Sequence, residues 1–190
     1  MTSSYNMFGN HTADNTIETS AVLGDREAFE ALVHLHGPAL YRYARRMLAY
    51  EADAPDVVQE TFLAAWRQRA SFRGDSSVKT WLFAICSRKI SDTYRLKRAD
   101  PIDDRLLVAV PDPDPHTDPF AATTTAQFFI ALDRALAELP ARQRATWIMR
   151  EVDSMTFPEI GTALLISADS ARGHHHRATR NLRLRLERWQ

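Results

Sequence analysis

Cysteine is almost absent from this sequence, and so are the signatures of secreted and membrane proteins. The single cysteine, Cys86, has no partner for an internal disulfide and offers a metal ion at most one thiolate ligand. No stretch of about 18 consecutive apolar residues occurs, so we expect no membrane span. The polar segment from Met1 to Ser20 lacks both a basic start and an apolar stretch, unlike a secretory signal. These absences predict a protein of the reducing cytoplasm.

Motifs for catalysis and cofactor binding are missing as well. The sequence has only six glycines and contains no Gly-rich phosphate loop, no GxSxG motif and no paired cysteine motif. His174, His175 and His176 are consecutive, and successive side chains on a helix point about 100° apart, so the three do not converge on one ion. His34 and His36 lack the carboxylate spacing of a zinc motif and are interpreted as helix-surface residues. We therefore expect no enzyme, no cofactor and no metal site.

The formal net charge is zero, but the charges are segregated along the chain. Residues 1–66 carry nine acidic and four basic side chains, whereas residues 67–98 carry nine basic and two acidic ones. Residues 99–120 carry six aspartates and one arginine, and residues 172–190 carry six arginines and one glutamate. Two basic blocks that flank an acidic segment indicate partners of different charge.

Helical periodicity of apolar residues runs along both sides of the acidic segment, and no alternating strand pattern is found. Before that segment the pattern predicts two short helices separated at Gly37-Pro38, a third helix that starts after Asp53, and a fourth over residues 78–98. After it, four more helices are expected: one closed by Pro140, one over residues 142–151, one opened by the capping box Thr156-Phe-Pro-Glu159, and one capped by Ser167 and running toward Trp189. The predicted fold class is all-α.

The acidic segment predicts a boundary between two small helical domains. Five of the nine prolines fall there: Pro101, Pro111, Pro113, Pro115 and Pro119. Proline fixes φ and removes backbone donors, so we expect an extended, mobile linker. The predicted organisation is a flexible tail at residues 1–23, a helical domain at 24–98, a linker at 99–126 and a second domain at 127–190. The linker either only joins the domains or itself occupies a basic channel of a partner.

The last two predicted helices, with a tight turn between them, are typical of a helix-turn-helix. The second of these helices is basic, and residues near its N-terminus are the ones that reach base edges in such motifs. The candidate DNA contacts are Ser170, Arg172, Gly173, His174 and Arg177. A solvated basic face on an ordinary helix has the same pattern, so both interpretations stay open.

Two blocks of sequence resemble conserved regions of one family. The N-terminal block contains DVVQETFLAAW at residues 56–66, WLFAI at residues 81–85, and the pair Asp92 and Arg95. The C-terminal block contains Leu139-Pro140, Arg144, Arg150-Glu151, Phe157-Pro-Glu-Ile160, Ser167 and Arg177-Ala178. These blocks are similar, in the same order, to the second and fourth regions of bacterial RNA polymerase sigma factors of the extracytoplasmic-function (ECF) group. The resemblance covers about residues 24–98 and 127–188.

The resemblance implies a non-enzymatic factor that binds core RNA polymerase, through its β′ clamp and β flap, and directs it to particular promoters. It implies that Asp56, Gln59 and Glu60 bind the polymerase. It implies that the −10 promoter element is bound by Arg73, Lys79, Thr80, Trp81, Arg88, Lys89, Asp92 and Arg95. Trp81 also fits the apolar stripe of its helix, so a role in the core is an alternative.

The resemblance further implies that the last helix reads the −35 element and that an anti-sigma protein binds the free factor. The chain departs from the family at Asp169-Ser-Ala171 and at His174-His175, where Gly-Thr-Val and Arg-Leu are usual, and Arg88 replaces a frequent Asn. These departures affect the promoter sequence that we expect to be preferred. The alternative function is a stand-alone helix-turn-helix regulator that binds duplex DNA without polymerase.

Overall fold

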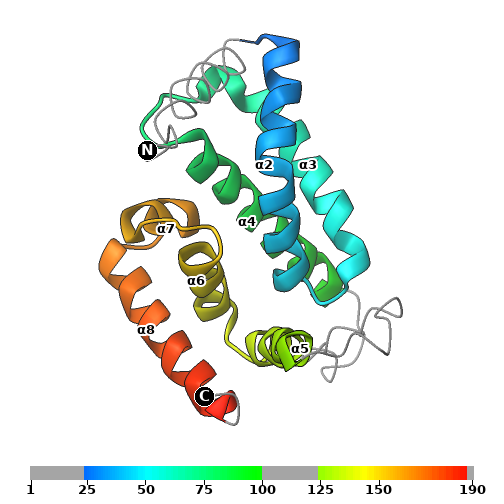
Figure 1. The fold of residues 1–190 in the computed structure, drawn as a ribbon. Helices are drawn as coiled ribbons and strands as arrows, with labels where there is room; N and C mark the ends of the chain where they lie inside the picture. The colour runs from blue at the N-terminus through cyan, green and yellow to red at the C-terminus, as the bar shows by residue number, and fades with distance from the viewer. Residues whose placement is uncertain (1–23, 100–123, 188–190) are drawn as a thin grey trace, which may run out of the picture.

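The computed structural model describes residues 24–99 and 124–187, and these residues form helices with no strand (Figure 1). The α-helices are α2 (Arg26–Met47), α3 (Ala54–Gln68), α4 (Val78–Ala99), α5 (Thr124–Ala137), α6 (Ala141–Glu151), α7 (Phe157–Leu164) and α8 (Ala168–Arg185). Two short 3-10 turns, η1 (Glu51–Asp53) and η2 (Arg69–Ser71), flank α3. The predicted tail and most of the predicted linker lie outside the described residues, as do residues 188–190.

Helices α2, α3 and α4 pack together as the N-terminal half (Figure 1). The Asp25 side chain caps α2 by accepting hydrogen bonds from the backbone N–H groups of Glu27 and Ala28. The apolar stripes of the three helices face one another, and the largest fully buried side chains include Tyr43 and Phe83, whose rings lie 5.2 Å apart.

Cys86 lies on the buried side of α4. Burial raises the pKa of its thiol to about 12, although a hydrogen bond with Thr61 opposes the shift. The thiol is therefore protonated at neutral pH and packs as a small apolar group.

The expected break at Gly37-Pro38 was wrong, because α2 continues through both residues as one helix of 22 residues. Pro38 has no backbone N–H to donate to the carbonyl of His34, and this loss ordinarily interrupts a helix. Here Leu32 and Leu40, on either side of the dipeptide, are both buried, and their packing keeps the helix continuous. His36 is also buried, at 8% exposure, so its interpretation as a surface residue was wrong.

Helices α5 to α8 form the C-terminal half. A capping box begins α7, since Thr156 and Glu159 each accept a hydrogen bond from the other's backbone N–H. The Ser167 side chain caps α8 by accepting from the Ser170 N–H. Helix α8 ends at Arg185, and α5 begins at Thr124, three residues before the predicted domain boundary.

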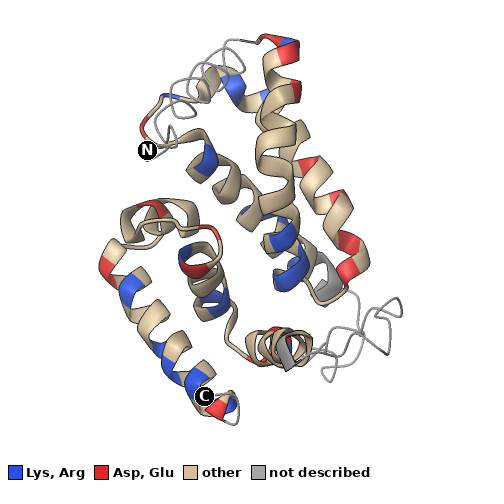
Figure 2. Ribbon diagram, in the orientation of Figure 1, with Lys and Arg blue, Asp and Glu red and all other residues tan. Residues whose placement is uncertain are grey.

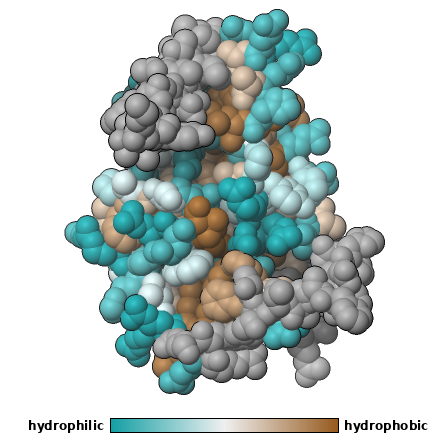
Figure 3. All heavy atoms as spheres, viewed as in Figure 1, coloured by the Kyte–Doolittle hydropathy of each residue, from teal (hydrophilic) through white to brown (hydrophobic). Residues whose placement is uncertain are grey.

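The two halves pack against each other, with α4 on α7 and α2 on α6 (Figure 1). Buried apolar residues of both halves form one continuous cluster, in which Leu82 of α4 joins Met149 of α6 and Ile160 of α7. A smaller cluster joins α5 to α8 through Leu136 and Leu182. In the space-filling view, hydrophobic residues reach this face of the surface only in small separate areas (Figure 3).

Candidate functional site

Helix α3 presents the predicted polymerase contacts on its solvent face. Asp56, Gln59 and Glu60 are spaced at i, i+3 and i+4, so they share one side of the helix, and all three are exposed. Acidic residues line the outer side of α3 (Figure 2). An apolar groove between α2 and α3 also reaches Gln59, and Phe62 and Leu63 line it. The structure therefore combines an acidic face with an adjoining apolar groove.

The predicted −10 residues at the start of α4 differ widely in exposure. Arg73 is exposed, whereas Thr80 is fully buried and its hydroxyl is hydrogen-bonded to Ser77 Oγ at 2.9 Å. A contact of Thr80 with DNA therefore requires this segment to rearrange. Trp81 is half-buried, packs against the core and lies 5.0 Å from the ring of Phe72. Trp81 thus contributes to the core while one part of its ring stays accessible.

Farther along α4 the remaining −10 candidates lie near solvent. Arg88 is exposed, and Lys89 pairs with Glu60 of α3 at 2.9 Å. Asp92 and Arg95 form an i, i+3 ion pair at 2.9 Å. These four residues form an accessible charged stretch that faces away from the buried stripe.

The turn between α7 and α8 has the close approach that a helix-turn-helix requires. A Cβ added at Gly161 would lie 2.7 Å from the Ile166 carbonyl oxygen, so only glycine fits this position. Leu165 takes the left-handed conformation, with φ 55° and ψ 48°, and it remains 75% exposed. The turn directs α8 outward with Ser170 and Arg172 in solvent.

The start of α8 brings the predicted −35 residues together. The Arg172 guanidinium pairs with Asp169 at 2.5 Å, and Arg177 lies 3.3 Å from His174 Nδ1. A Cβ added at Gly173 would lie 3.4 Å from the Arg177 guanidinium, which is an ordinary van der Waals contact, so the fold of the free protein does not require glycine here. Partial burial, together with Arg177 and Arg142, lowers the pKa of His174 and favours its neutral form. Basic residues continue along the exposed length of α8 (Figure 2).

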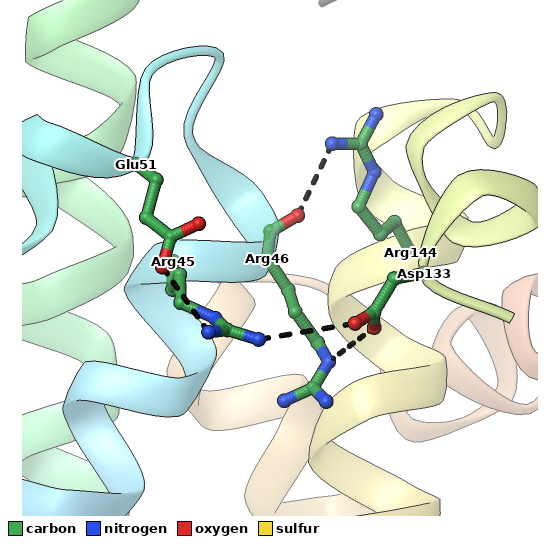
Figure 4. Close-up of polar contacts among 5 residues, drawn as sticks. All are labelled: Arg45, Arg46, Glu51, Asp133 and Arg144. Carbon is green, nitrogen blue, oxygen red and sulfur yellow. Dashed lines mark hydrogen bonds and ion pairs between the residues drawn. The ribbon is translucent and has the colours of Figure 1, made fainter. Parts of the chain in front are cut away.

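The sequence did not reveal the polar contacts between the halves. Arg46 Nε pairs with Asp133 of α5 at 2.9 Å, and Arg45 approaches the same carboxylate at 3.8 Å (Figure 4). Arg144 of α6 donates to the Arg46 carbonyl at 3.2 Å. Burial lowers the pKa of Arg144, and Tyr94 opposes the shift. These residues are far apart in sequence, so no spacing pattern indicates that they meet.

A second polar contact lies between α2, α4 and the loop from α6 to α7. Lys79 Nζ donates to the Asp153 carbonyl, and Arg42 lies 3.9 Å from the Asp153 carboxylate. That carboxylate is only 2% exposed. Burial raises its pKa, although the positive charges of Lys79, Arg42 and Arg46 oppose the shift. Lys79, which the resemblance places at the −10 element, is thus hydrogen-bonded to the C-terminal half.

Comparison with known proteins decides the family. Residues 32–99 match Sigma-70 region 2, and residues 129–182 match Sigma-70, region 4. The chain is 31% identical to the RNA polymerase sigma factor CnrH of Cupriavidus metallidurans, over 92% of this chain and 95% of CnrH. It is also 31% identical to the ECF RNA polymerase sigma factor SigM of Mycobacterium tuberculosis, over 92% and 85% of the two chains. The chain belongs to the ECF sigma factors.

Solved structures agree with this assignment. The structure of CnrH in complex with the cytosolic domain of CnrY matches the sigma factor with a TM-score of 0.69 and 30% identity, covering 92% of this chain and 97% of CnrH. The structure of RpoE with the anti-sigma factor NepR from Bartonella quintana has a TM-score of 0.70 at 24% identity, covering 84% and 96%, and supports the fold. The sequence prediction of an all-α fold with the two sigma regions is confirmed.

The sigma factor therefore binds RNA polymerase and directs promoter-specific initiation of transcription. The alternative of a stand-alone regulator is not favoured. Within residues 24–99 and 124–187, no helix combines the length and apolar character needed to span a membrane. The same part of the chain contains no group of three or more His, Cys, Asp or Glu side chains that could hold a metal ion.

Proposed function

We propose that the two halves of the sigma factor divide the work of initiation. The N-terminal half docks on core polymerase and holds the −10 element, and the C-terminal half reads the −35 element. The observation that carries this proposal is the opposite charge of two exposed helical faces, acidic on α3 and basic on α8, within the segments that match regions 2 and 4. An acidic face suits a protein partner, whereas a basic helix suits the phosphate backbone.

Polymerase docking is assigned to Asp56, Gln59 and Glu60 on the β′ clamp, with the adjoining groove receiving apolar side chains. The three residues are exposed on one face of α3, and packing on α2 and α4 holds that helix in place. Contact with the β flap of the polymerase is assigned to the C-terminal half. These docking contacts are independent of the promoter sequence.

The −10 element is assigned to the loop after α3 and the outer side of α4. Arg73, Arg88 and Arg95 are exposed and supply positive charge along the path of an unwound strand. Trp81 offers a ring on which a base stacks, and Lys79 is released from Asp153 when the strand binds. Thr80, Lys89 and Asp92 complete the set, with Thr80 acting only after rearrangement.

The −35 element is assigned to the first turns of α8, which enter the major groove as in other helix-turn-helix proteins. Ser170 and Arg172 contact base edges, Gly173 permits close approach, and His174 and Arg177 contact bases or phosphates. Asp169 holds Arg172 at 2.5 Å in the free protein, so it orients that guanidinium before DNA arrives.

The solved relatives suggest one further partner. CnrH was solved with the cytosolic domain of CnrY, and RpoE with the anti-sigma factor NepR. We propose that an anti-sigma protein likewise holds this chain in the cytoplasm by covering its polymerase-binding face. On this proposal the protein is regulatory, with no catalytic site and no cofactor.

The proposal is tested by mixing the full chain with bacterial core RNA polymerase and transcribing a genomic promoter pool. We expect a stable complex and new transcripts that neither component gives alone. Asp56→Asn should weaken the complex, with Glu27→Gln on α2 as an exposed control of the same charge change. Arg172→Ala should reduce use of the selected promoters by about 5- to 150-fold, because a base-contacting arginine contributes about 1–3 kcal/mol. The exposed Arg183 near the other end of α8 gives the matched control Arg183→Ala.

Two results would contradict the proposal. Absence of a complex with core polymerase, combined with tight binding of duplex DNA by the protein alone, would restore the stand-alone regulator. Equal effects of Arg172→Ala and Arg183→Ala would mean that α8 contributes only general positive charge.

A further inference from the structure

We propose that the loop between α6 and α7 is an intramolecular inhibitor of strand binding, held in place by an ionic clamp between α2 and α5. The loop comprises residues 152–156, and the clamp comprises Arg45, Arg46 and Asp133. This inference rests on the proposed function, because it assumes that the start of α4 binds the unwound promoter strand. It adds a closed state in which that site is already occupied by the protein itself.

Backbone hydrogen bonds from the loop to the end of α6 fix the loop in its place between the halves. The Asp153 N–H donates to the Ile148 carbonyl at 3.2 Å, and the Met155 N–H donates to the Met149 carbonyl at 2.9 Å. Ser154 between them has a positive φ of 55°, which turns the chain sharply. Met155 is 2% exposed, so the loop is anchored in the shared core.

The loop engages a cation that DNA would otherwise bind. The Asp153 carbonyl accepts a hydrogen bond from Lys79 Nζ. Glu159 at the start of α7 also faces Lys79: burial opposes its ionisation, but hydrogen bonds from Thr156 and the Lys79 charge outweigh burial and lower the pKa of Glu159. A phosphate and the loop therefore compete for the same ammonium group, and Glu159 repels the phosphate.

The clamp holds the opposite end of the interface. Asp133 receives Arg46 at 2.9 Å and Arg45 at 3.8 Å, and Arg144 donates to the Arg46 carbonyl at 3.2 Å (Figure 4). Asp133 and Arg46 keep 26% and 20% of their side-chain surface in solvent, so salt and competing partners reach them. Salt, a competing partner or a substitution can therefore weaken these ionic contacts, while the apolar contacts of the shared core keep the closed state dominant.

The connection between the halves permits opening. The 24 residues between α4 and α5 reach about 80 Å when fully extended. Helices α4 and α5 can therefore separate without breaking the chain. Opening would expose Lys79 and allow Thr80 and Trp81 to rearrange, which the predicted −10 contacts require.

The test uses Asp133→Lys, which places a third positive charge beside Arg45 and Arg46. The matched control is Glu138→Lys on the same helix, since Glu138 pairs at 2.7 Å with Arg185 inside the C-terminal half and does not cross the interface. Both substitutions change the net charge by the same amount, so a general gain in DNA affinity from added positive charge is equal in the two variants and drops out of their comparison. Asp133→Asn serves as a milder second variant, and circular dichroism verifies that each variant is folded.

Two readouts are measured on the full chain without polymerase. The first is energy transfer between dyes on Ala70→Cys in the N-terminal half and Leu184→Cys in the C-terminal half, both exposed positions. The second is the affinity for a fluorescent single-stranded DNA of mixed sequence. The apparent affinity of a mostly closed protein is reduced by its open fraction, so we expect Asp133→Lys to bind about fivefold tighter than Glu138→Lys.

The proposal predicts high energy transfer in the dye-labelled chain without a charge substitution and in Glu138→Lys. It predicts lower transfer, together with tighter strand binding, in Asp133→Lys. Low transfer in the labelled chain without a charge substitution would overturn the closed state. Lower transfer in Asp133→Lys without tighter binding would overturn the inhibition. Neither readout involves polymerase. A failure to bind core polymerase would therefore contradict the proposed function, and these two readouts would still decide whether the loop inhibits strand binding.

Discussion

At the scale of one residue, Asp153 shows how burial and nearby positive charge oppose each other at the interface between the two halves. Its carboxylate is almost fully buried, and its Oδ2 atom has no hydrogen-bond partner among the described residues. Three cations surround it, Lys79 from α4 and Arg42 and Arg46 from α2, yet burial prevails and the pKa is raised above its usual range. The folded protein therefore favours the neutral form of this acid more than the unfolded chain does.

Asp153→Asn is expected to change how stability depends on pH. A raised folded-state pKa contributes stability that is fully present below the unfolded pKa and is lost as pH rises through the folded pKa. The wild type should therefore gain stability relative to Asp153→Asn as the pH falls from 7 toward 4. Urea unfolding of both proteins across this range measures the difference. A difference that stays constant, or that reverses, would show that Asp153 is not held in its neutral form by the fold.

At the scale of the element, the helix-turn-helix has one required glycine, within α7, and one strained leucine, in the turn that follows α7. Gly161 is required because a Cβ would meet the Ile166 carbonyl oxygen. Leu165 instead adopts a left-handed conformation that costs an L-residue with a Cβ about 1–2 kcal/mol, and its side chain contributes little burial in return. The turn would therefore be more stable with a residue at position 165 that adopts the left-handed conformation without strain.

Leu165→Gly is expected to stabilise the protein by about 0.5–1 kcal/mol, because relief of strain exceeds the added entropy of the unfolded chain. The free energy of unfolding from urea titration measures the gain. Gly161→Ala, four residues earlier, should lower stability by at least about 1 kcal/mol. A loss of stability in Leu165→Gly would mean that the exposed leucine makes a favourable contact after all.

Local signals predicted most elements but not how they meet. Thr156 and Ser167 marked the starts of α7 and α8 because capping depends only on neighbours within one turn. Gly37-Pro38 was misinterpreted because the burial that keeps α2 continuous comes from other helices. The exposed face of α3 followed from spacing, whereas the contact of Lys79 with Asp153 joins residues 74 positions apart, which no periodicity reveals.

At the scale of the whole molecule, the shared core couples the two halves. Leu82, Met149 and Ile160 belong to one buried cluster although they come from both sides of the predicted linker. Apolar burial across this boundary stabilises each half through the other. The two sigma regions are thus distinct in sequence but joined in packing.

This coupling predicts a single cooperative unfolding transition. A variant with Trp147→Phe and Trp189→Phe reports fluorescence from the N-terminal half, and a variant with Trp66→Phe and Trp81→Phe reports from the C-terminal half. In each variant the fluorescence midpoint in urea should coincide with the midpoint from far-ultraviolet circular dichroism. Midpoints that separate in either variant would show that the halves unfold independently.

The buried thiol of Cys86 has a practical consequence. Alkylating reagents attack the thiolate, and this side chain is inaccessible and protonated in the folded protein, with a pKa of about 12. The alkylation rate of Cys86 therefore reports how often the helices around it come apart. Because Cys86 is the single cysteine of the sequence, the folded protein offers an oxidant no accessible thiolate until these helices separate.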